Sequence, residues 1–283
     1  SHYALIGMAL ITPDATGKDY PLFYDAINEK GLGMAGLNFT NNAVFHEKST
    51  DRDNIAQFEL IPWILGQCAT IAEAKALIAK MNFINTPFSE QLPPAELHWI
   101  LADKDSCIVV ESVRDGVHVY DNPTGVLTNN PPFNEQLFNL NNYMNLSATA
   151  PTNTFAPNIP LEVYSRGMGG IGLPGDLSSE SRFVKAVFTR AHSLSADDEL
   201  SSISQFFHIL HSVDQQHGCC DLGNNKYEYT IYSTCYNLDE GICYYTSYNN
   251  HQISAVNMHK TNLDGTELIS FPATLTEQIN YQN

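Results

Sequence analysis

Two asparagines of this sequence stand where an amide could stabilise negative charge on a reacting oxygen. Asn38 lies near the end of an apolar, strand-like run at residues 35–39, and Asn129 follows a second run at residues 125–128. A donor held at the end of a strand is rigid, and a rigid donor is what an oxyanion formed during acyl transfer requires. Each asparagine could instead cap a turn, since Asn is common in turns. Residue type and spacing leave both interpretations open.

Arg182 is the third candidate, because it places a cation where a helix begins. Polar residues introduce a helix there, with Ser178 or Ser179 as its N-cap, and Arg182 falls in the first turn. The positive end of the helix dipole opposes a cation, so local stability alone would not select arginine. One interpretation is a surface ion pair with Glu180 or Asp176, which would contribute little stability. The other is a buried charge directed at a site, and the residues alone do not decide between them.

Other motifs in the sequence do not have the context that their chemistry requires. Residues 167–172 match G-x-G-x-x-G, but Pro174 follows where a helix should begin, so we expect a packed or flexible loop rather than a dinucleotide site. His208, His211 and His217 could gather near one helix, but they have no carboxylate or thiol at ligand spacing. The sequence also contains no H-E-x-x-H and no G-x-S-x-G. We therefore expect neither a metal nor a cofactor.

The six cysteines are typical of free thiols rather than of a disulfide framework. None is spaced as C-x-x-C, and the neighbours Cys219 and Cys220 cannot easily bridge to each other. Disulfide frameworks belong to small secreted chains, whereas this chain is long and its opening residues are not those of a secretory signal. We expect reduced, mostly buried thiols in a cytoplasmic protein.

Composition argues against several classes of partner. The 283 residues include 14 Lys and Arg against 31 Asp and Glu, which gives a formal net charge of −17. Nucleic acids are bound by basic patches that replace counterions, and so few scattered cations do not form one. No apolar run reaches the roughly 20 residues of a transmembrane helix. Since 43% of the residues are hydrophobic, we expect a folded protein that binds neither nucleic acid nor a membrane.

Hydrophobic periodicity predicts strands and helices in alternating groups. The predicted strands cover residues 2–11, 21–28, 32–39, 97–102, 106–112 and 116–120, with further strands within 226–258. The predicted helices cover residues 54–67, 71–81, 179–191 and 203–213, and residues 121–181 show no clear period. Short turns between strands favour antiparallel pairing, so the order indicates an α+β arrangement of antiparallel sheets covered by helices. No linker or repeat divides the chain, and we expect one domain over residues 1–283.

Several segments together resemble the choloylglycine hydrolase family, which comprises conjugated bile salt hydrolases and penicillin V acylases. The resemblance extends from Ser1 to the C-terminus and is closer to the bile salt hydrolases. It is carried by residues 28–39 (NEKGLGMAGLNF), 97–99 (LHW), 121–131 (DNPTGVLTNNP), 172–176 (GLPGD) and 181–186 (SRFVKA). It implies an N-terminal-nucleophile hydrolase fold, an αββα sandwich of two antiparallel sheets between helical layers. It also implies cleavage of the amide that joins a bile acid to glycine or taurine.

The same resemblance implies roles for the three polar candidates. Asn38, through its backbone N–H, and Asn129, through its side-chain amide, match the family's oxyanion-stabilising positions. Arg182 matches an arginine beside the nucleophile. In the family mechanism an N-terminal Cys thiolate attacks the amide carbonyl, and its own α-amino group transfers the proton. A neighbouring arginine lowers the pKa of such a thiol.

The segment that opens the family pattern does not occur in this sequence. That segment contains two strands, a loop, the nucleophilic Cys, and an Arg and an Asp close behind it, and the match begins past it, at Ser1. All six cysteines are internal and have no free α-amino group. Ser1 could be a nucleophile in its place, but it matches an interior position before a core strand. We expect the first strands to be absent, a sheet edge to be exposed, and this polypeptide alone to be inactive and poorly folded.

The resemblance also sets expectations for substrate and assembly. The apolar steroid should lie against loops near residues 12–22 and 82–94, with Phe88 and Leu92 as contacts, although core packing is an alternative role for both. We expect a homo-oligomer, a tetramer, with subunit contacts in the Asn-, Pro- and Gly-rich residues 141–175. Two alternatives to a bile salt hydrolase stay open. One is a penicillin V acylase, and the other is a non-catalytic, ligand-binding remnant of the fold.

Overall fold

The computed structural model of the chain describes residues 2–283, so the interpretation of Ser1 as a nucleophile lies outside the described residues. Its largest element is an antiparallel sheet in the order β1-β2-β3-β6-β7-β8. These strands are β1 (Leu5–Pro13), β2 (Asp19–Asn28), β3 (Gly33–Asn38), β6 (Leu97–Ala102), β7 (Cys107–Val113) and β8 (Gly116–Asp121). Short turns join several neighbours, as predicted. Between β2 and β3, Gly31 has the positive φ that this tight turn requires.

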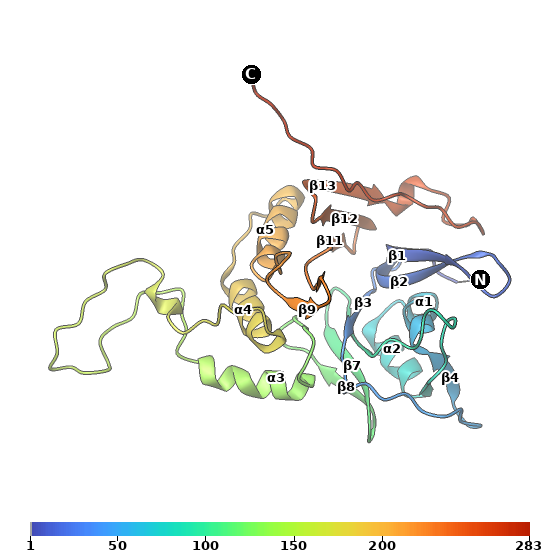
Figure 1. Ribbon diagram of the computed structural model, residues 1–283, viewed down its shortest axis with the longest axis horizontal. Helices are drawn as coiled ribbons and strands as arrows, with labels where there is room; N and C mark the ends of the chain where they lie inside the picture. Colours follow the sequence, from blue (N-terminus) through green and yellow to red (C-terminus); the bar gives the residue numbers. More distant parts are fainter. Residues whose placement is uncertain (1) are drawn as a thin grey trace.

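Helices α1 (Leu60–Leu65) and α2 (Ile71–Ile78) cover one face of this sheet (Figure 1). Their apolar side chains pack with strand residues that point to the same face, among them Trp99 and Leu101 of β6. Ala26 of β2 belongs to the same buried cluster. Because side chains alternate along a strand, Asp25, the residue before Ala26 on β2, points to the opposite face. This cluster is the main hydrophobic core.

A second antiparallel sheet faces the other side of β2. It consists of β11 (Tyr232–Asn237), β12 (Ile242–Ser247) and β13 (Asn250–Asn257). Tyr232 and Tyr236 of β11 both donate hydrogen bonds to the carboxylate of Asp25 on β2, which joins the two sheets.

Two further helices complete the layers. Helix α5 (Glu199–His211) packs on β11 and contacts α4 (Ser179–His192) (Figure 1). The order of helices, sheet, sheet and helices is the αββα sandwich expected from the resemblance.

Residues 54–67 do not form the single helix that their spacing predicts. They open with strand β4 (Asp53–Ala56), which pairs in parallel with β5 (Met81–Ile84), and α1 follows after a 3-10 turn. A short apolar run does not distinguish a strand from a helix. Here the burial of Ile55 opposite Phe83 favours the strand. The second predicted helix, at residues 71–81, ends at Ile78 as α2, because Met81 already belongs to β5.

Residues 121–181 contain a helix that the sequence pattern does not predict, α3 (Phe133–Asn139). Phe133 is fully buried and lies edge-to-face against Phe183 of α4, with their ring centroids 6.2 Å apart. So short a helix depends on tertiary packing rather than on its own periodicity. The other predicted helices are found as α4 and α5, although α5 begins earlier, where Asp198 caps it.

The remaining segments are short strands and irregular chain. Strands β9 (Asp221–Gly223) and β10 (Lys226–Tyr227) form a small hairpin. Residues 144–178 form a long loop with one 3-10 turn, and it extends away from the sheets (Figure 1). The chain after residue 260 has no regular secondary structure. Among residues 2–283, no helix is long and apolar enough to cross a membrane.

Candidate active site

The structure brings the three polar candidates into one hydrogen-bonded row. The guanidinium of Arg182 donates from Nη2 to Oδ1 of Asn129 at 2.7 Å. Nδ2 of Asn129 in turn donates to the backbone carbonyl of Asn38 at 2.8 Å. The three residues come from the first turn of α4, the loop after β8 and the end of β3. We call them the Arg182–Asn129–Asn38 row.

The backbone N–H and C=O of Asn38 do not form hydrogen bonds with the neighbouring strand, β6. The next residue, Phe39, donates its N–H to the carbonyl of Glu96 at 2.7 Å, and Asn38 lies opposite Leu97. Hydrogen-bonded and non-bonded pairs alternate along an antiparallel ladder, so the N–H and C=O of Asn38 point away from β6. On that side β2 pairs with β3 only at residues 33–35. The N–H of Asn38 therefore faces the same side as the carbonyl that Asn129 contacts.

Asn129 is held in one orientation by its contacts. Arginine can only donate, so the atom that faces Arg182 must be the amide oxygen, and Nδ2 must face Asn38. The backbone N–H of Asn129 donates to Oγ of Ser179 at 2.7 Å, and Nε2 of the buried Gln136 donates to its carbonyl at 2.8 Å. One of the two Nδ2 hydrogens is used by Asn38. The other has no partner within residues 2–283, which leaves one fixed donor available.

Arg182 does not form the surface ion pair that was one interpretation of its position. Within residues 2–283 its guanidinium has no salt bridge to Glu180 or Asp176, and besides Asn129 it contacts the carbonyl of Leu177 through Nε at 3.1 Å. Burial lowers the pKa of Arg182, and the carboxylate of Glu228 opposes that shift. Arginine nevertheless stays charged at neutral pH. The interpretation of a partly buried cation directed at other polar groups is the one the geometry supports.

Polar contacts at the start of α4 offset the cost of placing the Arg182 cation there. Ser178 is the N-cap and accepts a hydrogen bond from the N–H of Ser181. The exposed carboxylate of Asp176 accepts from the N–H of Ser178 at 2.9 Å and from the hydroxyl of Ser181 at 2.6 Å. These bonds to the side chains and backbone of the two serines lower the pKa of Asp176 to about 2. An anion at the N-terminus also offsets the repulsion between the helix dipole and Arg182.

Four of the six cysteines, three buried and one partly buried, are poor nucleophiles. Burial raises the pKa of the thiols of Cys68, Cys107 and Cys235 to about 11, and that of Cys243 to about 12. A thiol with such a pKa is almost fully protonated at neutral pH, whereas the thiolate is the attacking species. All six cysteines are free thiols.

Phe88 and Leu92 contact each other and an aromatic cluster. The ring of Phe88 packs against Tyr20 and Phe58, with centroid distances of 5.4 and 5.2 Å, and its N–H bonds the carbonyl of Leu92 at 3.2 Å. Within residues 2–283 no hydrogen bond or aromatic contact joins either residue to Asn38, Asn129 or Arg182. The contacts that the structure gives Phe88 are those of an aromatic cluster.

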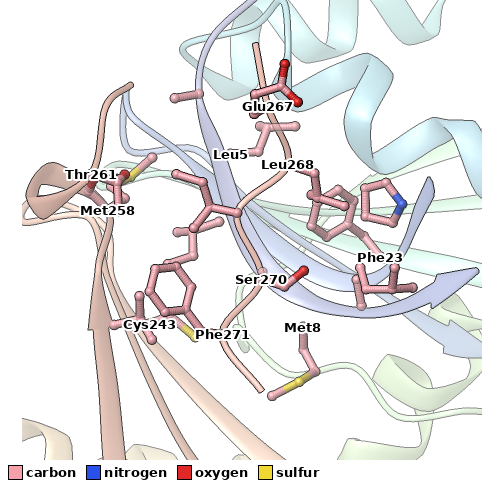
Figure 2. A pocket seen from close by; sticks show the side chains of 18 of the residues that line it. Leu5, Met8, Phe23, Cys243, Met258, Thr261, Glu267, Leu268, Ser270 and Phe271 are labelled. Atoms are coloured by element: carbon pink, nitrogen blue, oxygen red, sulfur yellow. Dashed lines mark hydrogen bonds between the residues drawn. The ribbon is translucent and has the colours of Figure 1, made fainter. Parts of the chain in front are cut away.

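An apolar cavity of about 690 Å³ lies between β1, β2 and the chain after residue 260. Figure 2 shows two side chains of this C-terminal chain in the cavity, Leu268 on the side of Leu5 and Phe23, and Phe271 on the side of Cys243. Tyr20 lines it, but none of the residues of loop 82–94 or of the Arg182–Asn129–Asn38 row does. The lining thus shares residues 18–21 with the loop near residues 12–22 and no residue with the Arg182–Asn129–Asn38 row.

Within the described residues, neither the glycine-rich residues 167–172 nor the three histidines near α5 form a ligand or metal site. A Cβ atom on Gly169 would fall 2.1 Å from the carbonyl oxygen of Thr149 and 2.3 Å from that of Ser147, so the glycine-rich residues 167–172 include a tightly packed turn. No three His, Cys, Asp or Glu side chains within residues 2–283 gather as a metal-binding group.

Sequence patterns did not indicate two buried polar residues next to the Asn129 loop, His98 and Glu111. His98 and Glu111 face each other at 3.0 Å on neighbouring strands and are both almost fully buried. The signal was the presence of a histidine and a glutamate at inward-facing positions of two apolar strands, since such groups are rarely buried without partners. Their pairing is a long-range contact that spacing cannot supply.

Comparison with known proteins gives a consistent result. Residues 1–271 match the family described as linear amide C-N hydrolases, choloylglycine hydrolase family. A Lactiplantibacillus plantarum protein named bile salt hydrolase/transferase is 56% identical over 271 residues, covering 96% of this chain and 82% of that protein. A Clostridium perfringens protein of the same name is 36% identical over 283 residues, covering 99% of this chain and 84% of that protein.

Solved structures agree on the fold. A mutant conjugated bile acid hydrolase from Clostridium perfringens superposes with a TM-score of 0.91 at 36% identity, over 99% of this chain and 84% of that chain. A penicillin V acylase from Agrobacterium tumefaciens superposes with a TM-score of 0.66 at 18% identity, over 93% and 79% of the two chains, which shows the fold alone. The predicted N-terminal-nucleophile hydrolase sandwich is thereby confirmed. The chain belongs to the choloylglycine hydrolase family of linear amide C-N hydrolases.

Proposed function

We propose that this protein hydrolyses the amide bond of bile acids conjugated with glycine or taurine. The substrate class rests on the relatives, since the 56% identical protein is named a bile salt hydrolase/transferase, whereas the penicillin V acylase is only 18% identical. The chemistry rests on one observation, the Arg182–Asn129–Asn38 row, which presents N–H donors at the end of a strand. Oxyanion stabilisation during attack on an amide carbonyl uses such donors.

In this proposal the second Nδ2 hydrogen of Asn129 and the backbone N–H of Asn38 stabilise the oxyanion. Each donor of this kind contributes roughly 3 kcal/mol to the transition state. Arg182 fixes the amide of Asn129 and places a positive charge beside it. The nucleophile is the N-terminal cysteine that the family pattern implies, a residue that this sequence does not include. The internal thiols with raised pKa values do not replace it. No cofactor takes part.

The substrate assignment is tested with protein expressed from its full open reading frame. Glycocholate, taurocholate and penicillin V are supplied in parallel, and the release of glycine, taurine or the penicillin nucleus is measured. The proposal expects kcat/KM for at least one conjugated bile salt to exceed that for penicillin V by at least about tenfold, or about 1.4 kcal/mol. Preferential cleavage of penicillin V would assign the runner-up activity. Binding of bile salts without cleavage would assign a ligand-binding remnant.

For the steroid we propose contact with the aromatic cluster of Phe88, Tyr20 and Phe58, with Leu92 at its side. The support is that this cluster joins the two loops near residues 12–22 and 82–94. A Phe88→Ala variant should then raise KM for glycocholate more than it lowers kcat. An unchanged KM would assign Phe88 to core packing.

We further propose that copies of this chain associate through the long loop, as a tetramer, and that the protein is cytoplasmic. The loop exposes large apolar side chains, with Phe155 89% and Tyr164 84% exposed. Exposed apolar side chains that gather into a patch often mark an interface between proteins. The six free thiols fit a reducing compartment. Sedimentation velocity should show a smaller species for a Phe155→Ser, Tyr164→Ser variant, but not for Leu194→Ser, which is exposed outside the loop.

A further inference from the structure

A buried polar pair lies directly behind the loop that carries Asn129. His98 of β6 and Glu111 of β7 are 0% and 1% exposed, and Nδ1 of His98 lies 3.0 Å from Oε1 of Glu111. Nε2 of His98 lies 2.8 Å from the carbonyl oxygen of Thr128. The N–H of Phe133, at the start of α3, donates to the same Oε1 at 3.0 Å. The pair therefore connects two central strands to both ends of the Asn129 loop.

The partners of the two ring nitrogens of His98 determine where its hydrogens lie. A carbonyl oxygen only accepts, so Nε2 of His98 carries a hydrogen and donates it to Thr128. A single further proton lies between Nδ1 and Oε1, either on the imidazole or on the carboxyl group. Both placements leave the Nε2–H bond to Thr128 intact. The stacked ring of Phe39, with its centroid 4.2 Å from that of His98, holds the plane of the imidazole.

The Thr128 carbonyl belongs to the peptide unit that precedes Asn129. The other polar end of that unit is the N–H of Asn129, which donates to Oγ of Ser179 at 2.7 Å. His98 and Ser179 thus hold the two ends of a single peptide plane. Gln136 accepts a hydrogen bond from the Thr128 hydroxyl at 3.0 Å. Because this plane sets the direction in which the Asn129 side chain leaves the backbone, its orientation controls the donor of the row.

We propose that His98 and Glu111 are positioning residues for amide hydrolysis, with His98 orienting the oxyanion donor Asn129 through Thr128 and Glu111 orienting His98. This inference rests on the proposed function. Within residues 2–283, no side-chain hydrogen bond joins His98 or Glu111 to Asn38, Asn129 or Arg182. A buried ionisable pair is weak evidence for stability, because apolar residues of similar volume often do as well. The contacts of the His98–Glu111 pair with the Asn129 loop instead account for a histidine and a glutamate in the core.

Two substitutions of His98 separate its two hydrogen bonds. In His98→Gln the amide nitrogen reaches the position of Nε2 and can still donate to Thr128, while the contact with Glu111 is lost. In His98→Asn the shorter side chain reaches only the position of Nδ1, so the bond to Thr128 is lost. Ile64→Val, in α1 of the main core, is a control for reduced stability without any change near Asn129.

Steady-state kinetics on the best conjugated bile salt, with protein from the full open reading frame, give the first readout. We expect His98→Asn to lower kcat by about 10- to 100-fold with little change in KM, since small misplacements of a catalytic group cost this much. His98→Gln should recover most of the loss, and Ile64→Val should retain the wild-type kcat. Equal losses in both His98 variants, or wild-type kcat in His98→Asn, would overturn the proposal.

A second readout does not depend on activity. The side-chain amide resonances of Asn129 are followed in protein labelled with ¹⁵N-asparagine and are assigned by their loss in Asn129→Asp. They should shift in His98→Asn and stay near the wild-type position in His98→Gln. Unchanged resonances in both variants would contradict the positioning role even if the wild type cleaved no bile salt. Inactive wild type with the expected shifts would contradict the proposed function alone.

Discussion

The chemistry proposed for the candidate active site depends on the direction of a single amide group. Asn129 presents its oxygen to Arg182 and its nitrogen to Asn38, and neither contact is possible with the amide reversed. The sequence predicted these three residues as candidates because each is polar at the end of a strand or the start of a helix. It did not predict that they touch, nor that His98 and Glu111 lie behind them, because those contacts join residues far apart in the chain.

Arg182→Lys tests whether the arginine acts by its geometry or only by its charge. Lysine keeps the positive charge but does not have the planar fork whose two separate nitrogens, Nε and Nη2, bond Leu177 and Asn129. We expect kcat for conjugated bile salt to fall by at least about tenfold, since a hydrogen bond to a charged group contributes about 1.5–3 kcal/mol. Arg114→Lys, on an exposed turn, serves as the control. Wild-type kcat in Arg182→Lys would show that charge alone suffices.

At the scale of elements, the site is held by the ends of β3 and α4 and by a loop packed on α3. Periodicity predicted β3 and α4, because both alternate or repeat their apolar residues over enough positions. It missed α3, β4 and β5, which are short and depend on partners such as Phe183 for Phe133 and Phe83 for Ile55. The elements that the sequence could not predict are those stabilised by long-range packing.

The N-terminus of α4 should lose stability in acid through Asp176. Hydrogen bonds from Ser178 and Ser181 lower the pKa of this carboxyl to about 2, below its usual value near 4. A lowered folded-state pKa means that the contribution is present above pH of about 4 and is lost as pH falls toward 2. Asp176→Ala should therefore lower the melting temperature at pH 7, and the difference from wild type should shrink between pH 4 and 2. Asp197→Asn, at an exposed position, is the control, and a pH-independent difference would contradict this assignment.

For the whole molecule, one contact between the two sheets is polar and lies at Asp25. The alternation of strand and helix groups with short turns predicted antiparallel sheets covered by helices, and the family resemblance implied two such sheets between helical layers. The contact of Asp25 on β2 with Tyr232 and Tyr236 on β11 joins residues more than 200 positions apart, so periodicity could not predict that these two strands face each other. That residues 1–283 form one domain stays a prediction.

The buried carboxyl of Asp25 should make stability fall as pH rises. Burial raises the pKa of Asp25, although its hydrogen bonds from Tyr236 and Tyr232 act in the opposite direction. The folded state then keeps a proton that the unfolded chain releases near pH 4, so stability decreases from about pH 4 up to the raised pKa. Asp25→Asn has no such proton, and its melting temperature should rise relative to wild type across this range. Asp264→Asn is the exposed control, and a constant difference between pH 4 and 8 would count against the assignment.

The most direct test of the candidate active site is kcat of Asn129→Ala on glycocholate or taurocholate, with protein from the full open reading frame. Removing one oxyanion donor costs roughly 100- to 1,000-fold in kcat, with little change in KM. The account predicts a loss in this range with an intact fold by circular dichroism. Wild-type kcat in Asn129→Ala would contradict the assignment of the Arg182–Asn129–Asn38 row as the site of the reaction.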